Sequence, residues 1–365
     1  MNEQVYHFGF GVDANYVKYA GVLMTNLVLR HPGQQLHFHL ACDGIDETDK
    51  RRLEEFVQKY RNVKVDVYDL RRQLDALKPI RSTAPSRLNR SVLLRILLPS
   101  LVPLEAKRLV YMDVDVICCR RLDELFALDL QGQAIAAVRD TKSSENAAAL
   151  GLAGGKYCFA GVLVINVVYW RQQCLTEHIV SYYQQYSDKL LLLEQDALNA
   201  VINGGFTELD KRYNFLIEVN NPLMCAYPED VAILHCVNEA KAWTKGCVPQ
   251  IYDLYWQYVR QSPWHDLQPV EPNTAKAVFL AATTAELQGD DVLSMSFSHY
   301  GYVGLEVDDY VDFEGVRYRM TERYRPKQKS AMEWEYSIKL YGPESLLRDV
   351  LVIKNFEGEH EAEFT

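Results

Sequence analysis

The order of apolar runs along the chain is the feature that most constrains its fold. Up to about residue 262, short β-branched or aromatic runs alternate with longer segments of helical spacing. Strands are expected at 5–11, 36–41, 63–68, 108–112, 134–138, 159–166 and 231–234, and helices at 16–30, 46–60, 91–101, 170–186 and 194–203. This alternation predicts an α/β fold, a mainly parallel sheet covered by helices.

The pattern changes after residue 262. Short strands separated by turns are expected at 277–282, 292–297, 315–320, 334–340 and 349–353, with no long helix between them. We therefore predict a first domain at 1–262, a Pro-containing linker at 263–275, and a small β-rich domain at 276–365. The sequence assigns no role to the last part.

Composition limits the classes of function. The chain has 365 residues, of which 48% are hydrophobic, and a net charge of -10. Such a chain can bury a large core, and its acidity argues against a nucleic-acid partner. No apolar stretch approaches the roughly 20 residues of a membrane span, and no secretory signal opens the sequence. Eight cysteines without a Cys-x-x-Cys pair indicate a reducing compartment. We expect a cytoplasmic protein, with peripheral contact to the inner membrane left open.

Two aspartates follow the apolar run 108–112 directly. Side chains alternate along a strand, so Asp113 and Asp115 would point the same way while the chain stays extended. At the carboxyl edge of an α/β sheet they would face the ligand crevice. Their mutual repulsion favours a cation between them, and carboxylate oxygens suit Mg²⁺ or Mn²⁺. The alternative is a pair of solvated aspartates that close a strand.

The first strand-to-helix turn carries Asp13, Asn15 and Tyr16. Short polar side chains there cap a helix, or they read the edge of a nucleobase on which Tyr16 stacks. Gly9-x-Gly11 is only a fragment of the dinucleotide fingerprint, so a Rossmann dinucleotide site is not supported.

Three cationic or imidazole side chains are further candidates. Arg95 lies on an apolar segment and requires an anion, either a ligand phosphate or carboxylate or an ordinary protein carboxylate. His235 ends the strand 231–234 and could complete a two-aspartate metal site, since Mn²⁺ accepts nitrogen. Lys241 could then neutralise phosphates that the metal does not reach.

Six segments, in this order, give the region 5–262 a resemblance to the family-eight retaining glycosyltransferases, relatives of glycogenin and of bacterial lipopolysaccharide galactosyl- and glucosyltransferases. The segments are Phe10–Tyr16, Leu94–Pro99, Tyr111–Asp115, Phe159–Asn166 with Trp170, Glu194–Asn199 and His235–Trp243.

The resemblance implies a nucleotide-sugar-binding, glycosyltransferase A-type fold, a UDP-sugar donor and Mn²⁺, with Mg²⁺ as the alternative. It also implies roles for particular residues. Asp113, Asp115 and His235 would bind metal; Asp13 and Asn15 would contact uridine, with Tyr16 near the base; Lys241 and the backbone at Asn238 would hold diphosphate; Arg95, Gln195 and Asp196 would line the donor sugar as catalytic residues; and Ala160 and Gly161 would leave room for the sugar ring.

Four positions depart from the family pattern. Phe159 stands where members commonly have Asn, Glu194 where they have Asp, Asn238 where they have Gly, and Ala242 where they have Pro. Asn tolerates the positive φ that such a glycine adopts. None of the four removes a metal ligand or the lysine, so an active enzyme is favoured.

The resulting prediction is a retaining hexosyltransferase that moves glucose or galactose from a UDP-sugar to a glycan or glycolipid, as in lipopolysaccharide biosynthesis. Two alternatives stay open. One is a sugar nucleotidyltransferase, which would want a basic glycine-rich loop where this chain has the acidic segment 9–13. The other is a catalytically silent carbohydrate-binding or assembly protein. The sequence leaves open the donor hexose, the acceptor and the oligomeric state. It also leaves open whether the reaction proceeds by front-side attack or by double displacement.

Overall fold

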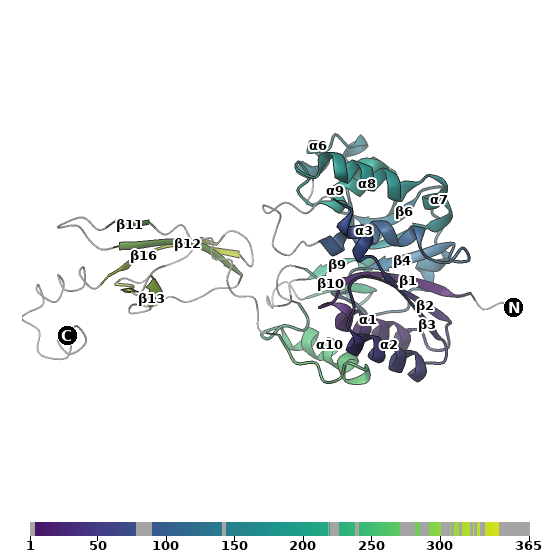
Figure 1. Cartoon of the computed structure of the whole chain (residues 1–365), viewed down its shortest axis with the longest axis horizontal. Coiled ribbons are helices and arrows are strands. Elements are labelled where there is room, and N and C mark those ends of the chain that lie inside the picture. The colour runs from purple at the N-terminus through teal and green to yellow at the C-terminus, as the bar shows by residue number, and fades with distance from the viewer. Residues whose placement is uncertain are drawn as a thin grey trace, which may run out of the picture. The chain divides into compact units, whose positions relative to one another are not determined.

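The protein is described by a computed structural model that covers residues 4–77, 90–140, 144–217, 219, 226–237, 241–270 and parts of 282–342. The chain divides into two compact units, Met1–Val270 and Glu271–Thr365, which are described separately (Figure 1).

A seven-stranded sheet forms the centre of the first unit, in the order β3-β2-β1-β4-β7-β6-β8. These strands are β1 (Tyr6–Asp13), β2 (Leu36–Asp43), β3 (Val63–Asp69), β4 (Arg108–Met112), β6 (Ile135–Arg139), β7 (Cys158–Asn166) and β8 (Thr207–Leu209). β1 runs parallel to β2 and β4, β2 to β3, and β6 to β8, whereas β7 is antiparallel to β4 and β6. The prediction of a mainly parallel α/β sheet is confirmed.

Helices cover both faces of this sheet (Figure 1). They are α1 (Val17–Arg30), α2 (Glu47–Lys59), α3 (Arg71–Asp75), α5 (Asp123–Ala127), α6 (Ser144–Ala149), α7 (Val167–Gln172), α8 (Leu175–Tyr186), α9 (Glu194–Ile202) and α10 (Pro249–Gln261). Alternation along the strands supplies a separate core to each face. Phe8 and Phe10 on β1 join the α1 side, and Leu109 and Tyr111 on β4 join the α8 side. In the part of the chain that the structure describes, no helix has the length and apolarity to cross a membrane.

Two expected helices are interrupted. The segment expected as one helix over 91–101 forms η1 (Arg90–Leu93), α4 (Leu94–Leu97) and η2 (Leu98–Ser100). Pro99 has no N–H for the carbonyl of Arg95, so a regular helix cannot run through it. The segment 170–186 is divided between α7 and α8, because Cys174 adopts a left-handed conformation with φ of 48°.

A smaller sheet brings distant segments together beside the carboxyl end of β4. It contains β5 (Val116–Cys118), β10 (Ile233–Cys236) and β9 (Phe215–Ile217). β10 runs antiparallel to β5 and places His235 opposite Val116. His235 is thereby held next to the turn that contains Asp115.

The first unit extends beyond residue 262. Residues 263–270, which the sequence suggested as the start of a linker, pack on the preceding fold. Trp264 is fully buried, and its Nε1 donates to Asp49 Oδ1 at 2.7 Å. A Cβ on Gly21 would lie 2.1 Å from the Trp264 ring, so this glycine lets α1 meet the indole. Val270 then forms a backbone bridge with Thr244.

The described parts of the second unit are mostly strands. They are β11 (Ala282–Thr284), β12 (Val292–Tyr300), β13 (Tyr310–Phe313), β14 (Val316–Arg319), β15 (Lys327–Gln328) and β16 (Glu333–Tyr341), all paired antiparallel. β12, β14 and β16 correspond to the expected strands at 292–297, 315–320 and 334–340. Of the other two expected strands, 349–353 lies outside the described residues, as do residues 277–281 of the strand expected at 277–282, whose last residue, Ala282, begins β11. The independence and the role of this unit stay predictions.

Candidate active site

Asp113 and Asp115 lie in the turn between β4, which ends at Met112, and β5, which begins at Val116. The extended geometry expected from the sequence is therefore not what aligns them. Asp113 N donates to the carbonyl of Gly161 at 2.8 Å, which ties the turn to β7. The two carboxylates still lie close together, with one oxygen of each within 4.8 Å of the other.

His235 joins the two aspartates. One ligand atom from each of Asp113, Asp115 and His235 lies within 4.8 Å of the other two. The approach of the imidazole depends on Gly161, where a Cβ would stand 2.4 Å from His235 Cε1. Gly161 therefore makes room for the histidine, whereas the sequence suggested room for a sugar ring. Phe159 packs edge-on against the same imidazole, with ring centroids 5.4 Å apart.

The orientation of His235 suits a metal ligand. Its Nδ1 lies 2.8 Å from Asn214 Oδ1, and as a donor there it leaves the Nε2 lone pair free in the neutral ring. That Nε2 faces Asp115 Oδ1 at 3.0 Å, and this buried oxygen has no hydrogen-bond partner. A lone pair that faces a carboxylate oxygen is the arrangement that a shared cation stabilises.

Lys241 completes the charge balance of Asp115. Its Nζ lies 2.7 Å from Asp115 Oδ2 and donates to the carbonyl of Cys236 at 3.0 Å. Burial raises the pKa of Asp115, but the charge of Lys241 is the largest of the effects that oppose burial, and this pKa lies well below its usual range. Trp243 anchors the lysine segment by stacking on Tyr19, with ring centroids 3.8 Å apart.

Arg95 connects the aspartate turn to α9. Its guanidinium lies 2.9 Å from Asp113 Oδ1 and 3.3 Å from Glu194 Oε1, and donates to the carbonyl of Ala160 at 2.8 Å. The sequence left open whether Arg95 pairs with a ligand anion or with a protein carboxylate. In the structure it pairs with two protein carboxylates, those of Asp113 and Glu194. Burial raises the pKa of Glu194 to about 7, against the opposing effect of Arg95. Burial likewise raises the pKa of Asp113 although Arg95 opposes it.

Gln195 and Asp196, at the start of α9, make hydrogen bonds within the protein. Gln195 Oε1 accepts from Ala160 N at 2.9 Å, and its Nε2 donates to Tyr157 Oη at 3.2 Å. Asp196 accepts from the Tyr157 hydroxyl and from two backbone N–H groups of the preceding loop, at 2.7 and 2.8 Å. The Asp196 carboxylate thus supports the loop that leads into α9. The contact of either residue with a sugar stays a prediction.

Asp13 ends β1, and Asn15 and Tyr16 follow in the turn before α1, as expected. Asp13 Oδ1 accepts from Asn15 N at 2.9 Å, which shapes the turn, and Asn15 is exposed. Tyr16 is 38% exposed and lies edge-on to Trp243 at 6.1 Å. An exposed aromatic ring beside polar groups can accept a nucleobase. Among the candidate residues, Asn238 lies outside the described residues.

Sequence reasoning missed two supporting residues. Asn214 orients His235, and Tyr157 holds both Gln195 and Asp196. Neither belongs to a recognisable motif, because each acts through a partner that is distant in sequence. Glu194 appeared only as a departure from a pattern, although its carboxylate is an ion-pair partner of Arg95.

Asp113, Asp115 and His235 fit a divalent metal. They offer two carboxylates and one imidazole, a donor set that borderline Mn²⁺ accepts and that Mg²⁺ accepts through its oxygens. The unpartnered Asp115 Oδ1 lies 3.0 Å from His235 Nε2, so a cation bound by both would satisfy this buried oxygen.

A sheet of this order, with an aspartate turn at its carboxyl edge and a polar strand-to-helix turn beside it, defines the glycosyltransferase A-type class of nucleotide-sugar-binding folds. The model of "Glycosyl transferase family 8" matches residues 7–247, and the chain belongs to this family.

Several relatives have about a quarter of their residues in common with this chain. General stress protein A of Bacillus subtilis is 25% identical and aligns with 73% of this chain and 96% of its own length. Lipopolysaccharide 1,2-glucosyltransferase of Escherichia coli is 25% identical and aligns over 71% and 79% of the two chains. Lipopolysaccharide 1,3-galactosyltransferase of Salmonella typhimurium is 25% identical and aligns over 76% and 84%.

Solved structures agree on the fold. The galactosyltransferase LgtC, in complex with donor and acceptor sugar analogues, matches with a TM-score of 0.58 at 22% identity, over 69% of this chain and 95% of that one. The glycosyltransferase GlyE of Streptococcus pneumoniae matches with a TM-score of 0.53 at 20% identity, over 74% and 67%. Family membership makes this chain a glycosyltransferase of family 8.

Proposed function

We propose that this chain is a retaining hexosyltransferase that takes glucose or galactose from a UDP-sugar with the help of Mn²⁺. The observation that carries the proposal is the convergence of Asp113, Asp115 and His235 within 4.8 Å of one another at the carboxyl edge of the sheet. In open α/β folds, nucleotide ligands bind outside the carboxyl edge of the sheet.

The donor would bind between the β1–α1 turn and the metal ligands. Asp13 and Asn15 offer polar groups to the edge of the uracil ring, and the exposed Tyr16 offers a face for stacking. Mn²⁺ held by Asp113, Asp115 and His235 would act as a Lewis acid toward the diphosphate. Lys241, now 2.7 Å from Asp115, would also donate to a phosphate oxygen.

Charge development at the reacting bond explains why cations are needed. Cleavage of the anomeric C–O bond leaves negative charge on UDP, which Lys241 stabilises as a fixed cation. Arg95, which is ion-paired with Asp113 and Glu194, orients the aspartate and keeps a positive charge beside the donor sugar.

Retention of configuration requires either a protein nucleophile or attack from the leaving-group side. The amide of Gln195 is a poor nucleophile, and both of its ends already hydrogen-bond to the protein. We therefore favour front-side attack, in which a diphosphate oxygen takes the acceptor proton while the new glycosidic bond forms.

The names of the relatives indicate which class of acceptor to expect. Lipopolysaccharide glucosyl- and galactosyltransferases at 25% identity suggest a glycan or glycolipid acceptor at the cytoplasmic side of a membrane. The acceptor would approach from the exposed side of the same crevice.

The decisive experiment measures UDP release from UDP-glucose and UDP-galactose, with Mn²⁺ and with a chelator. We expect turnover with Mn²⁺ for at least one donor and none in the chelator. Equal rates with the chelator would overturn the metal assignment, and UDP-sugar binding without turnover would favour the catalytically silent alternative.

Calorimetry tests the nucleotide preference separately. UDP should bind more tightly than GDP, ADP or CMP because Asp13 and Asn15 face the base. Equal affinity for GDP would contradict this assignment, while leaving the metal assignment intact.

A further inference from the structure

A second cluster of potential metal ligands lies in the amino-terminal half of the strands, away from the aspartate turn. His7 lies on β1, and His37 and His39 lie on β2. The register pairs His7 with His37 and Gly9 with His39, so the three histidines project from one face of the sheet. They are 8%, 6% and 0% exposed.

The three imidazoles are close enough to coordinate one ion. His7 Nδ1 and His39 Nε2 are 3.0 Å apart, and one ring nitrogen from each histidine lies within 4.8 Å of the others. Tetrahedral Zn²⁺ with Zn–N bonds of about 2.0–2.1 Å holds its nitrogens slightly more than 3 Å apart. The separation of the His7 and His39 nitrogens is close to this spacing.

Partners on β3 orient two of the rings. Asp66 Oδ2 lies 2.8 Å from His37 Nε2, and Tyr68 Oη lies 3.0 Å from His39 Nδ1. An outer carboxylate or hydroxyl on the second ring nitrogen is the usual support of a metal-bound histidine. With Nδ1 of His39 engaged, its Nε2 is the nitrogen turned toward His7.

The cluster also has the protonation state that metal binding requires. Burial lowers the pKa of His7 to about 4 and the pKa of His39 to about 2, so both rings are neutral near pH 7. Neutral imidazole is the form that ligates a metal.

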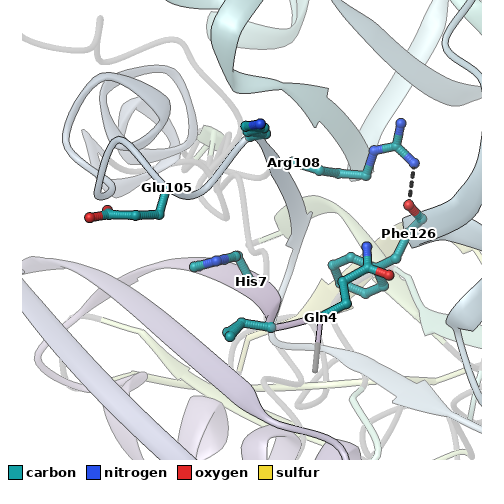
Figure 2. Close-up of a pocket in the computed structure, with 7 residues that line it drawn as sticks. Gln4, His7, Glu105, Arg108 and Phe126 are labelled. Atoms are coloured by element: carbon teal, nitrogen blue, oxygen red, sulfur yellow. Dashed lines mark hydrogen bonds between the residues drawn. The ribbon is translucent and has the colours of Figure 1, made fainter. Parts of the chain in front are cut away.

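One member of the cluster borders a cavity. His7 lines a cavity of about 270 Å³ together with Glu105, Lys107 and Arg108. Figure 2 shows His7 and the exposed Glu105 in this cavity, with Arg108 donating to the carbonyl of Phe126. Water in this cavity could therefore occupy a fourth position next to His7.

We propose that His7, His37 and His39 form a second metal site, specific for Zn²⁺ or a similar transition metal that prefers imidazole. The site joins β1 to β2 and is separate from the aspartate turn. Three histidines with no carboxylate among them discriminate against Mg²⁺, whose preferred ligands are oxygens.

The test is a zinc titration of the full chain, after treatment with a chelator, against a chromophoric competitor. Asp115→Asn should keep the tight site, whereas the double variant His37→Gln/His39→Gln should bind zinc at least about 100-fold more weakly. The matched control His178→Gln/His265→Gln removes two exposed histidines and should change nothing. Co²⁺ should give the visible absorption of tetrahedral nitrogen ligation in wild type but not in the double variant.

A milder variant keeps the test decisive if the double variant does not fold. Asp66→Asn leaves all three ligands in place and should weaken zinc binding by about 10–100-fold. Unchanged zinc affinity in a folded double variant, or in Asp66→Asn, would overturn the proposal. Loss of the tight site in Asp115→Asn would assign the zinc to the aspartate turn and would overturn it as well.

Discussion

The two halves of the central strands carry polar clusters of opposite character. At the carboxyl end, Asp113 and Asp115 have side chains 25% and 16% exposed and are balanced by Arg95 and Lys241. In the amino-terminal half, His37 and His39 are nearly inaccessible and are partnered by Asp66 and Tyr68.

The difference follows from the cost of burying charge. Carboxylates keep their charge only beside cations or water, so the aspartate turn needs Lys241 and Arg95 and stays open to the crevice. Imidazoles can become neutral instead, and three of them can be packed inside the fold. One cluster is therefore suited to an exchangeable charged substrate, and the other to a resident ion.

The largest effect should come from Asp115→Asn. Loss of one carboxylate charge leaves the metal under-coordinated and releases Lys241, so Mn²⁺-dependent UDP release should fall by more than about 100-fold, beyond the effect of losing an outer-sphere partner. Asp253→Asn, an exposed aspartate on α10, is the matched control. Near-normal turnover in Asp115→Asn would remove the functional difference between the two clusters.

The second-largest effect should come from shortening the chain, and it should affect both clusters together. A chain that ends at Val270 should keep UDP-sugar turnover and zinc binding, because Trp264 still packs against Gly21 and bonds to Asp49. A chain that ends at Ser262 loses this buried indole and should lose about 3–5 kcal/mol of unfolding free energy.

Urea denaturation of the two chains measures this difference. Equal stability would show that residues 263–270 do not support the first unit. A loss of turnover in the chain that ends at Val270 would show that the second unit contributes to the site.

The contribution of Glu194, beside the aspartate turn, to the stability of the fold should decrease as pH rises. The pKa of Glu194 in the folded state is raised to about 7 from 4.5, so its stabilising contribution is complete below pH 4.5 and is lost toward pH 7. Glu194→Gln should therefore gain a few degrees in Tm over wild type at pH 8 compared with pH 5. Glu177→Gln, which is exposed, should show no such gain, and an equal gain in both variants would contradict this assignment.

The histidine cluster should show an effect of opposite sign. The pKa of His7 is lowered to about 4 from 6.5, so its contribution is present above pH 6.5 and is lost as pH falls toward 4. The groups that act on His7 are His37 and Lys64, which lower its pKa further, and Glu105 and Asp66, which raise it.

With a chelator present, His7→Gln should lose less Tm between pH 6.5 and pH 4.5 than wild type does. Thermal melts at several pH values measure this, with His178→Gln as the control. A steeper loss in His7→Gln would mean that the neutral cluster is not what acid disrupts.

Much of the fold and many of the candidate metal ligands could be predicted from the sequence because the signals are local. Strand and helix periodicity defined β1 to β3 and α9, and the two aspartates on either side of Val114 marked the carboxyl end of β4. Local chemistry also explains why the helices expected at 91–101 and 170–186 were wrong. Pro99 and the left-handed Cys174 each interrupt an otherwise regular helix.

The sequence by itself determined which residue types could serve at the carboxyl edge: two carboxylates, an imidazole and a lysine. Only the tertiary structure decided how they meet. The turn after Met112, the pairing of β10 with β5 and the absence of a Cβ at Gly161 bring His235 to Asp115 across more than a hundred residues. Sheet register likewise placed His7 beside His37. Such contacts depend on packing between segments distant in sequence, which periodicity does not encode.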